Sequence, residues 1–266
     1  MGIFGGSWIP IILVILIVAY KNLPLVWHVR FLRTLLTRLF ISPVTKKQLS
    51  PECLFLPAIH RTRSPLTECD YNIHKSNSTY FTDLDISRGN LSLLLFSQRL
   101  SLRPTPNTAV MILSGVQCVF RKEIRPYQPY EVWSRVLSWD EKWIYIVSHF
   151  VERDAFRPRE YYLQRKKPRG CLQPTTPSQG DQVQKKVFAS AVSRYVFKQG
   201  QQAGSEGKEA RFGDAADKRP TWRSIEERRK RDLDAAQLRL GWDAVHNAFD
   251  GDVTMALGRY TDLLWR

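Results

Sequence analysis

The segment ECDYNIHKSNSTYFTDLDISR, residues 68–88, decides how the rest of this chain is interpreted. It concentrates polar side chains just where a helical pattern begins: Asp70, Asn72, His74, Asn77, Tyr80, Asp83, Asp85 and Arg88. Two interpretations are open at this point. The segment is either a solvated loop that leads into a helix, or an active site that is carried by one short stretch of chain.

A long helix follows the polar segment. From Thr79 onward one helical face collects Leu84, Ser87, Leu91, Leu94 and Leu95. Ser78 or Thr79 can cap its start, and acids in the first turns suit the positive end of the helix dipole. Gly89 lowers the helix propensity by up to about 1 kcal/mol relative to Ala. We predict a helix over residues 79–99.

Strand patterns surround this helix. A short strand is expected at 54–62, before the polar segment, and a long one at 107–124. Residues 127–154 contain two alternating runs joined by the turn WDEKW, which predicts an antiparallel hairpin. A further strand is expected at 186–198. One long helix followed by antiparallel strands indicates an α+β domain.

The N-terminal apolar run predicts a membrane anchor. The alternatives are a cleaved signal peptide, which the missing basic n-region and small-x-small cleavage site disfavour, and a soluble core helix. Residues 3–20 are uncharged, and this length of helix spans roughly 27 Å, close to a hydrocarbon core. Basic residues follow the apolar run and none precedes it, which places the rest of the chain in the cytosol. The next run, VWHVRFLRTLLTRLF, is amphipathic. It is either a helix on the membrane surface or an ordinary helix packed on the domain.

Composition narrows the classes of function. The 266 residues carry a formal net charge of +15, which favours an anionic partner such as a membrane, nucleic acid or coenzyme A ester. The four cysteines lack metal-binding spacing and fit free thiols in a reducing compartment. We therefore expect no metal and no cofactor. The basic segment 157–184 lacks aromatic residues alternating with basic ones on a strand, so we do not expect nucleic acid as a partner.

The polar segment resembles the signature of the 4-hydroxybenzoyl-CoA thioesterase-like hotdog superfamily, roughly D-x-D-x-x-x-H-x-N-N-x-x-Y. The matching positions here are Asp70, His74, Asn77, Tyr80, Asp85 and Arg88. The similarity is greatest to the membrane-anchored thioesterase superfamily member six proteins and their fungal thioesterase-like relatives. It covers about residues 48–198. Glu68, Ser76 and Ser87 depart from the usual pattern.

The resemblance implies a hotdog fold, in which an antiparallel sheet wraps a long helix, and hydrolysis of an acyl-CoA or acyl-carrier thioester. It implies catalytic roles for Asp70 as base or nucleophile and for His74 and Asn77 as orienting groups. Substrate would be bound near the helix start, by Ser78, Thr79, Tyr80 and Asp85. Leu91, Leu94, Val110 and Ile112 are candidates to line an acyl tunnel. Hotdog domains usually pair, so the resemblance also implies a homodimer.

Structural roles remain open for the same residues. Asp70 can cap the turn before the helix, His74 can be a hydrogen-bonded structural residue, and Asp85 and Arg88 can form an ion pair. The chain is therefore either a thioesterase or a catalytically silent hotdog module that binds acyl groups or scaffolds a membrane complex. A basic membrane or nucleic-acid binder is a third possibility.

These observations divide the chain into successive regions. We expect a single-pass membrane anchor at 1–21, an amphipathic juxtamembrane helix at 22–47 and the hotdog domain at 48–198 with a flexible insert at 157–184. A linker at 199–220 and a helical tail at 221–266 follow. The endoplasmic reticulum is the expected membrane, with the domain in the cytosol. Whether the pathway is lipid turnover or secondary metabolism stays open.

Overall fold

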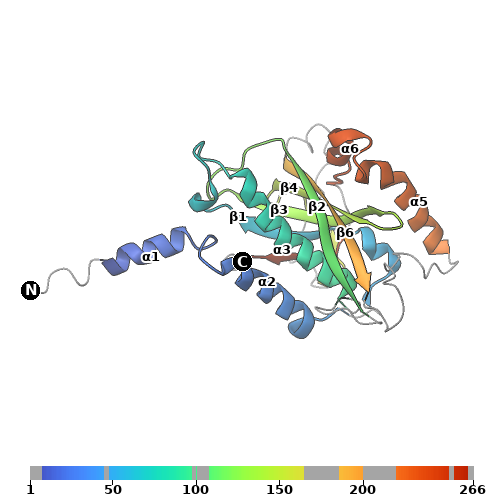
Figure 1. The fold of residues 1–266 in the computed structure, drawn as a ribbon, viewed down its shortest axis with the longest axis horizontal. Coiled ribbons are helices and arrows are strands. Elements are labelled where there is room, and N and C mark those ends of the chain that lie inside the picture. Colours follow the sequence, from blue (N-terminus) through green and yellow to red (C-terminus); the bar gives the residue numbers. More distant parts are fainter. Residues whose placement is uncertain are drawn as a thin grey trace, which may run out of the picture.

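A six-stranded sheet wraps around one long helix in the computed structural model (Figure 1). The structure describes residues 8–44, 48–97, 100, 108–164, 186–199, 220–251 and 255–262. The strand order is β2-β6-β4-β3-β1-β8. The strands are β1 (Ala58–Arg63), β2 (Ala109–Phe120), β3 (Pro129–Trp139), β4 (Ile144–Glu152), β6 (Val187–Gln199) and β8 (Gly258–Thr261).

The central helix, α3 (Asn77–Phe96), is confirmed, but it begins two residues before the predicted start. Ser76 occupies the N-cap position, and the hydroxyl of Thr79 donates to the Ser76 carbonyl oxygen at 2.7 Å, so Thr79 lies inside the first turn. The predicted apolar face is buried from Leu84 to Leu94. Leu91 and Leu94, two of the candidates to line an acyl tunnel, instead pack in the core with Ile146.

The predicted hairpin is confirmed as β3 and β4, which pair antiparallel through a turn at Asp140. Its carboxylate accepts hydrogen bonds from the backbone N–H groups of Lys142 and Trp143, which closes the turn. Alternate side chains of β3 reach opposite faces of the sheet. Ser134 faces α3, where its hydroxyl lies 2.8 Å from that of Ser87, whereas Trp133 faces away from the helix.

Two C-terminal helices cover the other face of the sheet: α5 (Pro220–Ala236) and α6 (Gly241–Asn247). The prediction of a purely helical tail is wrong beyond them. β7 (Met255–Ala256) pairs in parallel with β5 (Glu160–Tyr161), and β8 joins the main sheet parallel to β1. A four-residue strand is too short to give a periodic signal in the sequence. β8 is extended because it pairs with the edge of β1.

The N-terminal helices lie on the α3 side of the sheet. Figure 1 shows α1 (Trp8–Val18) projecting from the body, with α2 (Val26–Leu36) beside α3. None of the described helices has both the length and the apolar character that a bilayer span requires. Residues 1–7 of the predicted anchor, most of the predicted insert and nearly all of the predicted linker lie outside the described residues.

Gly89 is explained by the contact between α2 and α3. A Cβ atom at this position would lie only 2.7 Å from Cε2 of Phe31, whose ring stacks on Trp27 with centroids 5.4 Å apart. The missing side chain therefore allows the aromatic ring of α2 to lie directly on α3. The lower helix propensity of glycine is tolerated because it permits this close approach.

We expect Gly89→Ala to lower the free energy of unfolding by about 1–3 kcal/mol, because the added methyl group overpacks the contact with Phe31. In a Phe31→Ala background the same substitution should raise it by about 1 kcal/mol through helix propensity. Urea unfolding of the four chains measures both effects. Equal stabilisation in both backgrounds would contradict the role assigned to Gly89.

Candidate active site

The loop before α3 doubles back on itself, with Cys69 and Lys75 forming an antiparallel bridge. The backbone N–H of Asp70 donates to the His74 carbonyl at 3.0 Å, and that of Ile73 donates to the Asp70 carbonyl at 3.0 Å. Ile73 has a φ of 59°, a left-handed conformation that is costly for a β-branched residue. The turn places Asp70 Oδ1 3.6 Å from His74 Nδ1.

The Asp70 carboxylate belongs to this turn and is also accessible to solvent. Its Oδ1 accepts a hydrogen bond from the Asn72 backbone N–H at 3.0 Å, which is an Asx turn. Its side chain is 28% exposed, and no described donor bonds the second oxygen. His74 Nε2 lies 3.9 Å from the exposed Glu123 carboxylate. Asp70 and His74 are therefore brought together at the surface.

The first turn of α3 completes this surface. Among the described residues, no acceptor is found for the backbone N–H groups of Asn77 and Ser78, which are exposed. The Ser76 N–H instead donates to the Glu68 carbonyl at 2.8 Å, and the Thr79 hydroxyl also reaches that carbonyl at 3.3 Å. These bonds fix the start of the helix, with two free donors at the positive end of its dipole.

The other predicted site residues support the helix. Tyr80 is buried in the core, where its ring meets Phe120 and Phe150 edge-on. Asp85 is partly exposed and forms the predicted ion pair with Arg88. We therefore keep Asp70, His74, Asn77 and Ser78 as candidate reactive residues, and assign packing or structural bonds to Thr79, Tyr80 and Asp85.

Beneath the loop lies an ionic cluster of six buried side chains: Lys21, Arg30, Glu68, Lys75, Asp83 and Asp262. Lys75 Nζ lies 2.7 Å from Glu68 and 3.1 Å from Asp83. Lys21 Nζ lies 3.0 Å from Asp83 and also contacts Glu68. Arg30 bridges Asp83 at 2.8 Å and Asp262 at 2.6 Å. Three cations and three carboxylates leave the ionic cluster neutral.

The opposite charges of the ionic cluster stabilise the ionised forms of its carboxylates. Burial alone would raise the pKa of Asp83, but Lys21, Lys75 and Arg30 outweigh it and hold that pKa well below its usual range. Burial likewise opposes ionisation of Asp262, but the attraction of Arg30 lowers its pKa to about 2. The Tyr130 hydroxyl donates to Asp83, and that of Thr62 donates to Asp262 at 2.7 Å.

Sequence reasoning missed the ionic cluster. It assigned Glu68 as a departure from the family signature, whereas Glu68 accepts hydrogen bonds from the two buried lysines. Arg30 and Asp262 are 232 positions apart, so no local pattern links them. Lys21, directly after the apolar N-terminal run, is the one signal of the ionic cluster in the sequence, but a basic residue at this place also fits the positive flank of a membrane anchor.

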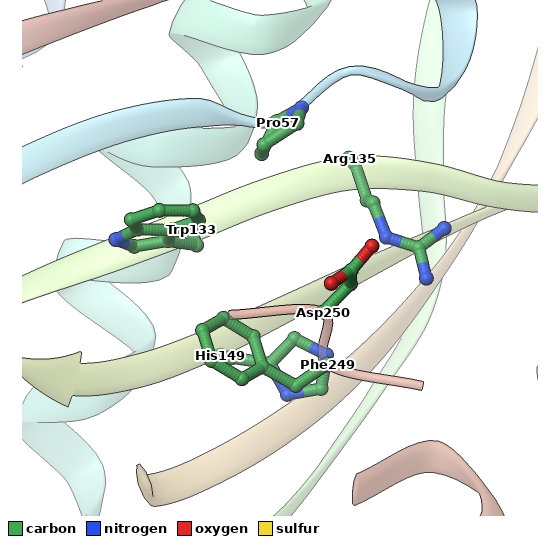
Figure 2. Close-up of a pocket in the computed structure, with 6 residues that line it drawn as sticks. All are labelled: Pro57, Trp133, Arg135, His149, Phe249 and Asp250. Carbon is green, nitrogen blue, oxygen red and sulfur yellow. The ribbon is translucent and has the colours of Figure 1, made fainter. Parts of the chain in front are cut away.

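A small pocket lies on the opposite face of the sheet (Figure 2). It is lined by Pro57, Trp133, Arg135, His149, Phe249 and Asp250. The Asp250 carboxylate lies beside the Arg135 guanidinium, which donates to the Ala248 carbonyl at 2.8 Å (Figure 2). The cavity volume of about 10 Å³ matches one water molecule and excludes an acyl group.

A serine and two histidines meet beside that pocket. The Ser190 hydroxyl lies 2.9 Å from His149 Nδ1 and 3.0 Å from His246 Nδ1. Burial lowers the pKa of both imidazoles, so they are neutral near pH 7. Ser190 and His149 are enclosed, so a thioester cannot reach them. This arrangement is a buried hydrogen-bond chain that ties α6 to the sheet.

The described residues offer little support for a nucleophilic cysteine or for a metal site. Cys53, Cys69 and Cys118 are free thiols, and burial raises the pKa of Cys69, which disfavours the nucleophilic thiolate. Within the described ranges, no three side chains of His, Cys, Asp or Glu gather as metal ligands. Cys171 lies outside these ranges.

Comparison with known proteins gives consistent matches. Residues 64–216 match the family model of the thioesterase-like superfamily. The chain is 36% identical to the thioesterase poxG of Penicillium oxalicum over 91% of this chain and 87% of that protein. It is 39% identical to the probable thioesterase atnL of Emericella nidulans over 68% of this chain and 62% of that protein.

Among solved structures, the chain is similar to 4-hydroxybenzoyl-CoA thioesterase from Pseudomonas sp. strain CBS-3. The sequence identity is 14%, the TM-score is 0.35, and the match covers 58% of this chain and 94% of that one.

The ionic cluster predicts a specific pH dependence of stability. Asp262 has a folded pKa of about 2, below its unfolded value, so its stabilisation is present above about pH 4 and is lost as the pH falls toward 2. The shift corresponds to about 2 kcal/mol. Asp262→Asn should therefore be less stable than the parent at neutral pH, and the gap should shrink by about 2 kcal/mol on acidification.

Urea unfolding at a series of pH values measures this difference. Asp243 provides the control, since its ion pair with Arg121 is exposed to solvent and Asp243→Asn should stay within about 1 kcal/mol of the parent at every pH. A gap between Asp262→Asn and the parent that stays constant as the pH falls would show that the Asp262 carboxylate is not held by Arg30.

Proposed function

The chain belongs to the thioesterase-like superfamily, and from this premise we propose that it is a hydrolase of thioester bonds. The substrate class that we propose is an acyl thioester of coenzyme A or of a carrier protein. Relatives named as thioesterases support the reaction. The arrangement of Asp70, His74 and the start of α3 supports this loop as the site of the reaction.

The start of α3 is the proposed site for the thioester carbonyl. As the carbonyl is attacked, its oxygen becomes negatively charged and needs hydrogen-bond donors in fixed positions. The N–H groups of Asn77 and Ser78 meet this need. Both point out of the helix start toward solvent, and the helix dipole favours negative charge there. The amide side chain of Asn77 is a further donor on the same turn.

Asp70 is the proposed base or nucleophile. As a base, its carboxylate takes a proton from water while the water oxygen bonds to the carbonyl carbon. The C–S bond then breaks, and the leaving thiolate takes the proton to give a free acid and a thiol. As a nucleophile, the Asp70 carboxylate bonds to the carbonyl carbon and the C–S bond breaks, which gives a mixed anhydride and a thiolate. Water then cleaves the anhydride to the free acid and the Asp70 carboxylate, and its remaining proton goes to the thiolate. His74 orients the carboxylate at 3.6 Å in either route.

One observation carries this proposal. Because Cys69 and Lys75 form an antiparallel bridge, the loop reverses direction, and the solvent-accessible Asp70 carboxylate lies at the same end of the domain as the first N–H groups of α3. The ionic cluster holds both ends of the loop, through Glu68 at its start and Lys75 at its end. The reactive groups are thus exposed while their support is buried.

Asp70→Asn should strongly slow release of free thiol from acyl-CoA esters and acyl-carrier thioesters, since the amide is neither a base nor a nucleophile. The rate should fall by about two to four orders of magnitude. Asp243→Asn is the matched control on an exposed carboxylate away from the loop, and it should keep the parent rate. Unchanged turnover in the folded Asp70→Asn chain would exclude Asp70 from catalysis.

A catalytically silent acyl-binding module is the second candidate function. The Asx turn at Asp70 favours it, because Oδ1 already has a structural partner in the Asn72 N–H. The same panel of thioesters separates the two functions. A folded parent chain that binds acyl-CoA but releases no thiol from any ester or carrier substrate would select the silent module.

We also propose a homodimer that forms through β2. This 12-residue strand pairs with β6 on one edge. On the other edge, among the described residues, only Ala109 has a partner, in an isolated bridge with Leu100. Its exposed side chains include Ile112 and Leu113. A long apolar edge presents unpaired N–H and C=O groups to any second strand, and antiparallel pairing of two copies satisfies both.

The double substitution Ile112→Lys/Leu113→Lys should convert the dimer to a monomer, because like charges would face each other across the paired edges. Sedimentation equilibrium measures the mass directly. Leu240→Lys, on an exposed leucine near α6, is the matched control and should remain dimeric. A parent chain that sediments as a monomer at all concentrations would refute the pairing.

We further propose that the chain is anchored to a membrane through its N-terminal apolar segment. α1 exposes most of its large apolar side chains, among them Trp8, Ile9 and Val14. The first acidic residue of the chain is Glu52, so only positive charge accompanies this segment. The basic residues after the segment support a position of the domain in the cytosol. The endoplasmic reticulum is the membrane that we propose.

A further inference from the structure

Helix α2 packs with its polar stripe facing inward. Arg30 forms ion pairs with Asp83 and Asp262 in the ionic cluster. Two turns later, Arg38 in η1 (Thr37–Ile41) donates to Asn90 Oδ1 at 2.8 Å. Its guanidinium also stacks 4.0 Å from the centroid of the Tyr260 ring. Both arginines are buried, so two cationic side chains of this segment lie on its protein side, whereas Arg33 is exposed.

The opposite side of the helix faces outward and is mostly apolar, with the exposed His28 on it and the exposed Arg33 at its border. Each residue turns the helix by about 100°, so a side chain two positions from Arg30 lies on the other face. The exposed residues on and beside this outer face are Leu25, Val29, Leu32, Leu36, Leu39, Phe40 and Ile41. Phe40 and Ile41 are 74% and 75% exposed. We call these seven residues the outer α2 face.

This orientation departs from that of most surface helices in water-soluble proteins, although Phe31 still packs against α3. A surface helix normally buries its apolar stripe and exposes its charges. Each large apolar side chain contributes about 1.5–3 kcal/mol when it is fully buried. The seven side chains of the outer α2 face are 41–75% exposed, so a large part of this contribution is unused. A contiguous apolar surface of this kind marks a site of interaction with a protein or a membrane.

The surroundings of the outer α2 face favour a lipid surface. It follows α1 in the sequence, and the apolar side chains of α1 that the structure describes are also exposed. No acidic residue occurs before Glu52, and Lys46 and Lys47 follow the apolar stretch. Apolar side chains bordered by basic ones match a bilayer with anionic headgroups, in which the apolar face enters the acyl boundary and the cations meet phosphate.

We propose that the outer α2 face lies in the interfacial layer of an anionic bilayer, parallel to its plane. This inference rests on the proposed membrane anchoring and deepens it, since α2 becomes a second contact beside α1. Arg30 links α2 to Asp83 on α3, so the contact also fixes the orientation of the candidate active site relative to the bilayer. An acyl thioester that partitions into the membrane would meet the site in one orientation.

The test uses the full chain in vesicles of phosphatidylcholine and phosphatidylserine. Its native cysteines are replaced by serine, and a nitroxide is attached at Leu36→Cys or, as the matched control, at Leu240→Cys. Both leucines are exposed, so neither label disturbs the core. Electron paramagnetic resonance then measures the collision of each nitroxide with oxygen, which concentrates in lipid, and with a nickel chelate, which stays in water.

The label at Leu36 should collide readily with oxygen and weakly with nickel, whereas the label at Leu240 should show strong collision with nickel. Strong collision with nickel at Leu36 would overturn the inference. Protection from both reagents would also overturn it, since a protein surface would then cover α2. Flotation of the parent with the vesicles is scored separately, so a failure of α2 docking is distinguished from a failure of anchoring.

Discussion

The buried ionic cluster is the interaction on which the rest of the structure depends. Lys21 and Arg30 come from the N-terminal region, Glu68, Lys75 and Asp83 from the site segment, and Asp262 from the C-terminal region. Removal of a single partner would leave a buried charge uncompensated, at a cost of about 3–5 kcal/mol. The ionic cluster therefore makes both ends of the chain part of the domain that carries the candidate site.

Within the polar segment, residues 68–88, the buried side chains hold the structure and the exposed side chains are the candidates for chemistry. Glu68 and Lys75 hold the two ends of the loop from below, and Asp83 holds the second turn of α3. Asp70 and His74 are left at the surface, beside N–H groups that have no acceptor among the described residues. Fold alone does not establish activity. The chemistry proposed here depends on the exposed groups, and the stability of the domain depends on the buried ones.

The sequence predicted the features that depend on local patterns. The helical period revealed α3, alternation and the WDEKW turn revealed the hairpin, and spacing revealed the Asp85–Arg88 pair. Amphipathicity also identified α2, but a helical period does not say which face turns inward. That choice depends on Asp83 and Asp262, which are 53 and 232 positions from Arg30. The strand β8 was missed for a similar reason, since its partner β1 is distant in sequence.

Amide hydrogen exchange of a Lys21→Met chain tests the central claim most directly, with Lys230→Met on the exposed side of α5 as the control. If the ionic cluster unites the domain, the loss of Lys21 should speed exchange in residues 68–79 and in β8 as well as around residue 21. The control should match the parent throughout. Faster exchange confined to the residues around position 21 would contradict the account and leave the site segment to be held by its own contacts alone.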